Sequence, residues 1–183
     1  MSDKMEVYYF SPTGGTKKVS YIFAAAIGKD AVWHDLRDKQ TPTEQPQGEL
    51  IIVAAPVFAG RIPSVVREKI KTLAGEGKQA VTIAVYGNRA YEDALLEMND
   101  ILIQDGFTVI ASAAFVAQHS IVPEVGAGRP DAEDIKEIRT FAEAVKRSTS
   151  AENVHVPGNR PYKPGMNVAA APLSLPSCTA CGA

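Results

Sequence analysis

The feature that most constrains the fold is an alternation of apolar runs with helical stripes along the first 147 residues. Four runs of Val, Ile, Ala and Phe are nearly continuous, which is typical of strands in a parallel sheet that is covered on both faces. A fifth, weaker run completes the set. The expected strands are residues 5–10, 31–36, 50–57, 80–86 and 108–116.

Apolar residues at helical spacing fill most of the connections between these runs. Pro63 and Asp131 stand where two of the helices would begin, and the connection around residues 41–48 is short. The expected helices are residues 19–27, 64–73, 91–102 and 131–145. This alternation predicts an α/β fold, a doubly wound five-stranded parallel sheet with helices on both faces.

The character of the chain changes after about residue 148. Residues 148–176 contain five prolines and two glycines and show no periodicity, which indicates an extended linker or an arm lying on the domain. We therefore expect one domain over residues 1–147 and a proline-rich tail over residues 148–183.

The composition narrows the class of partner. The 183 residues carry 19 basic and 21 acidic side chains, a net charge of −2, and the pI is about 5.9. Without a basic block, this argues against a nucleic-acid surface and favours small molecules or proteins. No apolar stretch is long enough to cross a bilayer and the N-terminus lacks a signal-peptide pattern, so we expect no membrane contact and a cytoplasmic location. The oligomeric state is not predicted.

Residues 10–17 read FSPTGGTK and follow the first expected strand directly. One interpretation is a plain strand-to-helix turn, because Ser, Pro, Thr and Gly are turn residues and Ser and Thr cap helices. The other is an anion cradle. A helix start offers unpaired N–H groups and a positive dipole end, glycines allow close approach, and hydroxyls add donors.

The loops after the third and fourth expected strands read PVFAGRIP (56–63) and YGNRAYED (86–93). Both carry an aromatic residue and a glycine early, which suits a flat heterocycle. In an open parallel sheet, ligands bind beyond the carboxyl ends of the strands, near the point where strand order reverses. A phosphate at one loop and a flat ring between two others indicate a mononucleotide, and neither GxGxxG nor GxxxxGK[ST] occurs.

These three loops resemble those of flavodoxins, which bind flavin mononucleotide (FMN) on a five-stranded sheet in the order 2-1-3-4-5. SPTGGT matches the flavodoxin form T/S-x-T-G-x-T, and Gly87, Asn88, Tyr91 and Glu92 match the later loop. The resemblance covers about residues 5–146. It implies the same fold, FMN as the cofactor, and electron transport.

The resemblance also implies a role for each loop. The hydroxyls of Ser11, Thr13 and Thr16, with the N–H groups of Gly14 and Gly15, would hold the flavin phosphate. Phe58 and Tyr91 would cover the two ring faces, and Asn88 would meet the pyrimidine edge. The Ala59–Gly60 peptide would address the flavin N5 and rearrange on reduction, which glycine makes easy. The expected cofactor-binding residues are Ser11, Pro12, Thr13, Gly14, Gly15, Thr16, Pro56, Val57, Phe58, Ala59, Gly60, Tyr86, Gly87, Asn88, Arg89, Tyr91 and Glu92.

The sequence gives expectations for four further residues, and it leaves two of them, Arg61 and His119, with two interpretations each. Lys17 is expected to be solvated and not to hold the phosphate. Arg61 stands where flavodoxins usually carry an acidic residue, so it either lies near the ring and raises the flavin potential or points outward to dock a partner. His119, in the long loop after the fifth strand, is either a proton shuttle or a hydrogen-bonded structural residue. Trp33 is expected to pack in the weak second strand.

The two cysteines, Cys178 and Cys181, lie close to the C-terminus in the sequence CTACG. They resemble the opening of a bacterial ferredoxin motif, although an iron–sulfur cluster of that kind needs four thiolates. The chain also resembles fused flavodoxin–ferredoxin proteins. We therefore expect the cysteines to ligate a cluster only in a longer natural chain; a redox-active CxxC is the alternative.

The expected function is an FMN-binding module that passes electrons between a redox protein partner and a fused iron–sulfur (ferredoxin) domain. The cofactor supplies this chemistry, and no catalytic nucleophile, complete metal site or acid–base pair is needed. Two alternatives are a flavin-dependent NAD(P)H/quinone-type reductase on the same fold and a binding module that has lost the cofactor.

Overall fold

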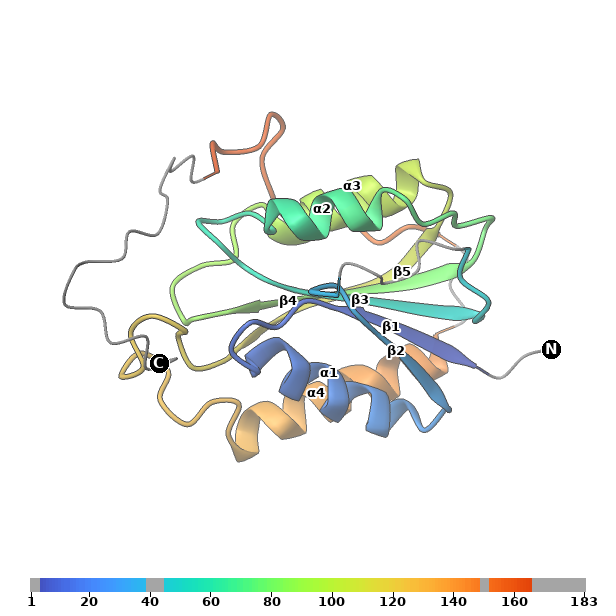
Figure 1. Ribbon diagram of the computed structural model, residues 1–183. Helices are drawn as coiled ribbons and strands as arrows, with labels where there is room; N and C mark the ends of the chain where they lie inside the picture. The colour runs from blue at the N-terminus through green and yellow to red at the C-terminus, as the bar shows by residue number, and fades with distance from the viewer. Residues whose placement is uncertain (1–3, 39–44, 149–151, 166–183) are drawn as a thin grey trace.

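Figure 1 shows the computed structural model, which describes residues 4–38, 45–148 and 152–165. These residues form one parallel sheet of five strands in the order β2-β1-β3-β4-β5. The strands are β1 (Met5–Tyr9), β2 (Ala31–Asp35), β3 (Leu50–Pro56), β4 (Gln79–Tyr86) and β5 (Thr108–Val116). The predicted doubly wound sheet and its strand order are confirmed.

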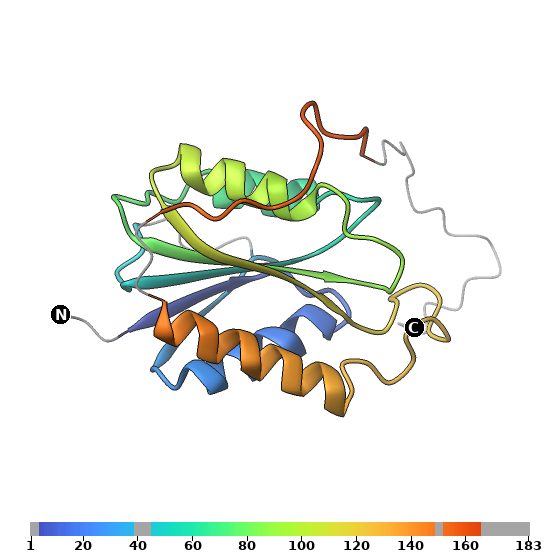
Figure 2. The same ribbon diagram turned by 180° about the vertical axis from the view of Figure 1, so that it is seen from behind.

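Helices cover both faces of this sheet, as predicted (Figures 1 and 2). On one face lie α1 (Gly15–Ile27) and α4 (Ala132–Arg147), and on the other lie α2 (Ser64–Ile70) and α3 (Ala94–Gln104). Along β3, Ile52 belongs to the apolar core under α1 and α4, whereas Ile51 belongs to the core under α2 and α3. Because both faces are buried, the strand is continuously apolar.

Six of the eight helix ends differ from the predicted ones. α1 begins at Gly15 and not at 19, α3 ends at Gln104 and not at 102, and α4 spans Ala132–Arg147 and not 131–145. The other two differences have a clear cause in the backbone. α3 begins at Ala94 and not at 91, because Glu92 has a φ of 42°, in the left-handed region that a helix does not use. α2 ends at Ile70 and not at 73, because the N–H groups of Thr72 and Leu73 donate to carbonyls three residues back, as in a 3₁₀ turn.

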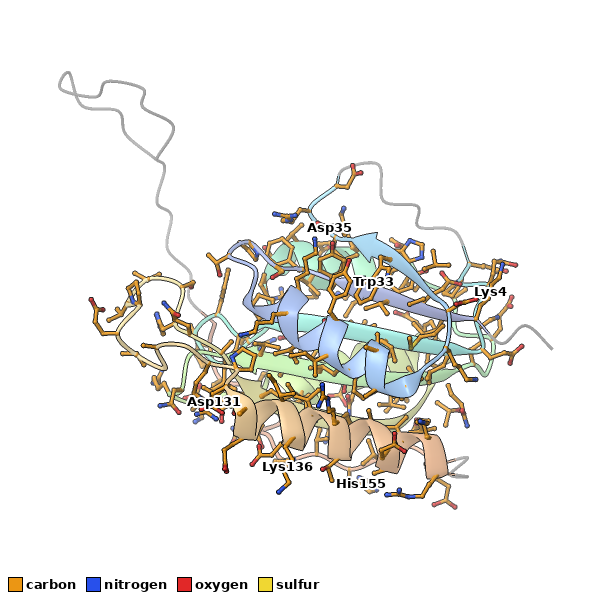
Figure 3. All side chains as sticks on the ribbon, turned by 90° about the horizontal axis from the view of Figure 1, so that it is seen from below. Lys4, Trp33, Asp35, Asp131, Lys136 and His155 are labelled. Atoms are coloured by element: carbon orange, nitrogen blue, oxygen red, sulfur yellow. The ribbon has the colours of Figure 1, made fainter. Side chains whose placement is uncertain are left out.

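The weak sequence pattern of β2 follows from its place at the edge of the sheet. Val32 is 45% exposed, so this strand buries less apolar surface than the central ones. The Trp33 ring stacks on Tyr21 with centroids 4.0 Å apart and meets Tyr9 edge-on at 5.9 Å. Figure 3 labels Trp33 on β2 beside α1. These contacts are the packing role expected of Trp33.

A buried carboxylate ties the segment before β3 to the first two strands. Glu6 is 6% exposed, and its oxygens accept hydrogen bonds from the N–H groups of Gln47 and Gly48 and from the Tyr8 hydroxyl. His34 Nε2 lies 2.8 Å from the same carboxylate. Burial by itself would raise the pKa of Glu6, but these hydrogen bonds outweigh it and hold the pKa below its ordinary value.

Residues 152–165, called the arm below, run along β5 and then over α3 (Figure 2). The Val154 N–H donates to the Val109 carbonyl at 2.8 Å, and Val154 and Val156 pack on the core under α2 and α3. The described part of the proline-rich tail therefore lies on the domain. The boundary at residues 147 and 148 stays a prediction.

Among the described residues, no helix is long and apolar enough to cross a membrane.

Candidate functional site

The carboxyl ends of β1, β3, β4 and β5 meet at one edge of the sheet, and the loops that follow them line a pocket. Strand order reverses between β1 and β3, so the pocket lies at the topological switch point where ligands of open α/β sheets bind. The lining residues are Ser11, Pro12, Thr13, Gly15, Thr16, Pro56, Val57, Phe58, Val85, Tyr86, Gly87, Ala117, Gln118, His119 and Ser120.

The loop from residue 11 to 16 leads into α1, which begins without a side-chain cap at its first N–H groups. The N-cap is Gly14, with a φ of 91°, and Ser11 Oγ accepts the Lys17 N–H at 3.0 Å. The N–H groups of Gly15 and Thr16 find no acceptor within the described residues, and neither do the Thr13 and Thr16 hydroxyls. These groups are the donors that an anion needs.

The geometry of this loop fits a phosphate group. A Cβ atom added to Gly14 would meet no atom within 4 Å, so the backbone is open to a close ligand. The described residues that line the pocket include no Asp or Glu that would repel an anion. The pocket encloses about 80 Å³ and adjoins a second hollow of about 400 Å³, which shares Thr13, Gly15, Gln118, His119 and Ser120 with it. The two together fall within the roughly 300–1,000 Å³ of typical ligand sites.

Lys17 does not line this pocket within the described structure. Its side chain is exposed, and Nζ lies 5.9 Å from the centroid of the Tyr9 ring and 5.7 Å from that of Tyr21. This position agrees with the solvated role expected for Lys17.

The loop after β3 makes a tight turn. The Phe58 N–H donates to the Arg61 carbonyl at 2.8 Å, and the Arg61 N–H donates to the Phe58 carbonyl at 3.1 Å. Ala59 and Gly60 both have positive φ, at 50° and 80°, as in a type I′ turn. The Ala59 carbonyl and the Gly60 N–H bond to no described residue, and Gly60 is buried beneath the Glu92 carboxylate.

Replacing Ala59 by glycine is expected to raise the free energy of unfolding by about 0.5–1 kcal/mol, because an L-residue in the left-handed region is strained by more than glycine loses in backbone entropy. Urea denaturation measures this. The control is Ala90→Gly, at an exposed position in the next loop without positive φ. An equal loss of stability in both variants would contradict the assigned turn.

The loop after β4 is in contact with the loop after β5 through Gly87. A Cβ atom on Gly87 would lie 2.4 Å from His119 Cδ2, so only glycine leaves room for the imidazole ring. The Nδ1 atom of His119 accepts the N–H groups of Ile121 and Val122, both at 3.1 Å. This geometry assigns the ring proton of the neutral imidazole to Nε2. His119 is thus a hydrogen-bonded structural residue that also lines the pocket; proton shuttling stays a prediction.

The structure separates the two aromatic residues expected on opposite faces of the ring. Phe58 lines the pocket and is 42% exposed. Tyr91 meets Tyr86 edge-on at 5.7 Å and lies in a groove on the other side of the loop after β4. That groove is lined by Tyr86, Arg89, Ala90, Tyr91, Glu92, Asp93, Pro157, Gly158 and Asn159. Within the described residues, Phe58 and Tyr91 do not line a common pocket.

Four more predicted residues lie outside the lining of the first pocket: Gly14, Ala59, Gly60 and Asn88. Asn88 is exposed, with a φ of 61°. Ala59 and Gly60 form the central peptide of the turn, and the Glu92 carboxylate rests on Gly60, where an added Cβ would lie 2.0 Å from Oε2. Sequence reasoning named His119 but missed its neighbours Ala117, Gln118 and Ser120. These residues directly follow β5, which pairs with β4, and this position could have predicted them as site residues.

The structure pairs Arg61 with α3 and the arm, and the two roles that the sequence left open, a charge near the flavin ring and a docking residue, both stay predictions. The Arg61 Nε and Nη2 donate to the two oxygens of Glu97 on α3, at 2.9 and 2.6 Å, and its guanidinium lies 4.4 Å from the Tyr162 ring centroid. The Glu97 side chain is only 2% exposed, so it needs a cationic partner. Hydrogen bonding to Glu97 outweighs burial and raises the pKa of Arg61 above its ordinary value. Arg61 points to α3 and the arm.

Cys178 and Cys181 lie outside the described residues. Within those residues, no group of three or more His, Cys, Asp and Glu side chains could hold a metal ion.

Comparison with known proteins found no matching protein family and no matching curated protein. Solved structures do match. Flavodoxin 1 from Bacillus cereus superposes with a TM-score of 0.61 and 20% identity, over 80% of this chain and 99% of that chain. The chain has the flavodoxin fold.

Two further matches differ in how much of the matched chain they cover. A Fusobacterium nucleatum flavodoxin bound to flavin mononucleotide has a TM-score of 0.59 and 13% identity, over 79% of this chain and 97% of that chain. Rubredoxin oxygen:oxidoreductase from Desulfovibrio gigas has a TM-score of 0.57 and 16% identity; the match covers 79% of this chain but 35% of that longer one. At such identities the likeness concerns the fold, and the ligand must be argued from the site.

Proposed function

We propose that this chain binds FMN without a covalent bond and serves as an electron-transfer module. The observation that carries the proposal is the start of α1 at the switch point of the sheet. There the N–H groups of Gly15 and Thr16 find no acceptor among the described residues, and Thr13 and Thr16 line the same pocket as the loops after β3 and β4. The matched Fusobacterium flavodoxin, which binds FMN, supports the choice of ligand.

Different residues of the pocket would bind different parts of the cofactor. Thr13, Thr16 and the N–H groups of Gly15 and Thr16 would hold the phosphate, and the exposed Phe58 ring would cover one side of the flavin. FMN, when bound, supplies the electron-transfer chemistry. Because Phe58 is 42% exposed, a ring packed against it would keep an edge open to solvent, which suits exchange of electrons with a separate redox protein.

We also propose that Cys178 and Cys181 ligate an iron–sulfur cluster in a longer natural chain, as the start of a fused ferredoxin domain. One contact supports this arrangement: Gly165, the last residue that the structure describes, lies against the side chain of Arg61, which ends the turn of residues 58–61. A domain attached beyond Gly165 would start from the rim of the proposed flavin site. Iron and acid-labile sulfide in the longer natural protein, lost when both cysteines become serine, would support it.

The visible absorption spectrum of the purified chain tests the flavin proposal, with the released chromophore identified by chromatography. We expect FMN as purified or after reconstitution. A protein that stays colourless after incubation with FMN would be a binding module without this cofactor, and the proposal would be wrong. Oxidation of NAD(P)H with a quinone by the isolated chain would favour the reductase, whereas a carrier needs a partner enzyme to reduce it.

A further inference from the structure

We propose that the arm is part of the cofactor site, where it holds the loops after β3 and β4 in the positions that bind the flavin ring. The inference rests on the proposed function. It extends the proposed function by giving the arm residues a positioning role, which they exert through their contacts with Asp93 and Arg61.

Asp93 links the two loops to each other and to the arm. Its backbone N–H donates to the Gly60 carbonyl at 2.9 Å, which joins the loop after β4 to the turn after β3. Its carboxylate is fully buried and makes no capping bond to α3 within the described structure. Instead, Oδ1 accepts the N–H and the Nδ2 of Asn159, both at 2.8 Å, and Oδ2 accepts the Lys163 N–H at 2.7 Å. Within the described structure, every hydrogen bond of this carboxylate therefore goes to the arm.

Arg61 makes the matching connection from the other loop. Its Nη1 donates to the Lys163 carbonyl at 3.0 Å, and its guanidinium stacks over Tyr162. The Tyr162 hydroxyl donates to Asp100 on α3 at 2.6 Å, which fixes the ring under the guanidinium. Lys163 thus bonds with its N–H to one loop and with its carbonyl to the other.

The arm approaches α3 so closely that its backbone has little freedom at this point. A Cβ atom on Gly158 would lie 2.6 Å from Leu96 Cδ2, so only glycine allows the contact. Lys163 Nζ also lies 3.9 Å from Glu92, whose carboxylate rests on Gly60. Both loops and the arm therefore form one hydrogen-bonded unit beside the pocket, and release of the arm would remove the bonds that both loops make to Lys163.

The two ends of the arm offer a matched pair of variants. Asn159→Ala removes a side-chain bond to Asp93 next to the pocket. Asn153→Ala removes a side-chain hydrogen bond at the other end, where Asn153 Oδ1 accepts the Val109 N–H at 2.8 Å near the start of β5. Because the pocket lies beyond the carboxyl end of β5, Asn153 is remote from it. Tyr162→Ala removes the ring under Arg61, and Tyr162→Phe keeps it.

The experiment measures, in the full chain, the FMN dissociation constant, the midpoint potential of the bound flavin, and amide hydrogen exchange of the apo-protein at Asp93. We expect Asn159→Ala and Tyr162→Ala each to weaken FMN binding tenfold or more, to shift the potential, and to speed exchange of the Asp93 amide without any flavin. Asn153→Ala should leave the dissociation constant and the exchange rate within twofold of the wild-type values and the midpoint potential unshifted. Tyr162→Phe should keep most of the affinity that Tyr162→Ala loses.

The outcomes separate this inference from the proposed function. If the wild-type chain binds FMN and the variants at Asn159 and Tyr162 bind it equally well, the role of the arm is wrong and the proposed function stands. Equal losses in Asn153→Ala and Asn159→Ala would also overturn the inference, because they would indicate a general loss of stability. A wild-type chain that binds no FMN would overturn the proposed function itself, and the inference with it.

Discussion

Removing the two free threonine hydroxyls, with Thr13→Ala and Thr16→Val together, is expected to weaken FMN binding by about 3–6 kcal/mol, because each hydrogen bond to a charged group contributes about 1.5–3 kcal/mol. This corresponds to roughly 10²- to 10⁴-fold in the dissociation constant. Valine is chosen at position 16 because Thr16 is 3% exposed, and valine keeps its buried shape. Quenching of FMN fluorescence on titration measures the change.

Lys17→Ala is the control for the phosphate site. Lys17 is the nearest cation in the sequence of the loop, but its amine lies beside Tyr9 and Tyr21 and outside the pocket lining. We expect the affinity of Lys17→Ala for FMN to stay within about threefold of wild type, since an exposed charge is screened by water. Unchanged affinity in the double threonine variant, or a large loss in Lys17→Ala, would show that the phosphate binds elsewhere.

Replacing Glu6 by glutamine is expected to lower the free energy of unfolding by about 3–5 kcal/mol, the usual cost of removing one partner from a buried charged network. Glu6 accepts from four donors, and a glutamine amide would turn an N–H group toward some of them. Urea denaturation at pH 7 measures the loss. The exposed neighbour Glu49 is the control, and Glu49→Gln should change stability by about 0.5 kcal/mol or less.

Because Glu6 titrates, the difference in unfolding free energy between wild type and Glu6→Gln depends on pH. Burial raises the pKa of Glu6, but the hydrogen bonds from Gly48, Tyr8, Gln47 and His34 outweigh it, so the net pKa is below the ordinary value. A lowered pKa in the folded state stabilises the fold above the unfolded value of about 4, and this contribution is lost as the pH falls through the folded pKa. The stability gap between wild type and Glu6→Gln should therefore narrow below pH 4. A gap that widens there would contradict the assignment.

The strands and the location of the site could be predicted from the sequence because both depend on local patterns. β3 and β4 are apolar at nearly every position, since the sheet buries both of their faces. The first loop is recognisable because its glycines and hydroxyls follow β1 without a gap. Once the strands are parallel, their carboxyl ends must share one edge, and the loops must meet there.

The helix ends and the partners of Arg61 could not be predicted in this way. α3 begins after Glu92 because of one left-handed backbone conformation, which leaves no trace in the apolar spacing of residues 91–102. Arg61 finds Glu97 at a separation of 36 residues and the Lys163 carbonyl at a separation of 102. No local pattern records partners at such distances.

The sequence by itself determined the fold class, the strand positions and the loops that form the candidate site, because strand and helix periodicity is set by burial over a few neighbouring residues. Only the tertiary structure decided which groups of those loops face the pocket. It placed His119 on Gly87, Tyr91 on Tyr86 and the arm on Asp93, because contacts between distant segments depend on how the layers pack and on where each buried polar group finds a partner.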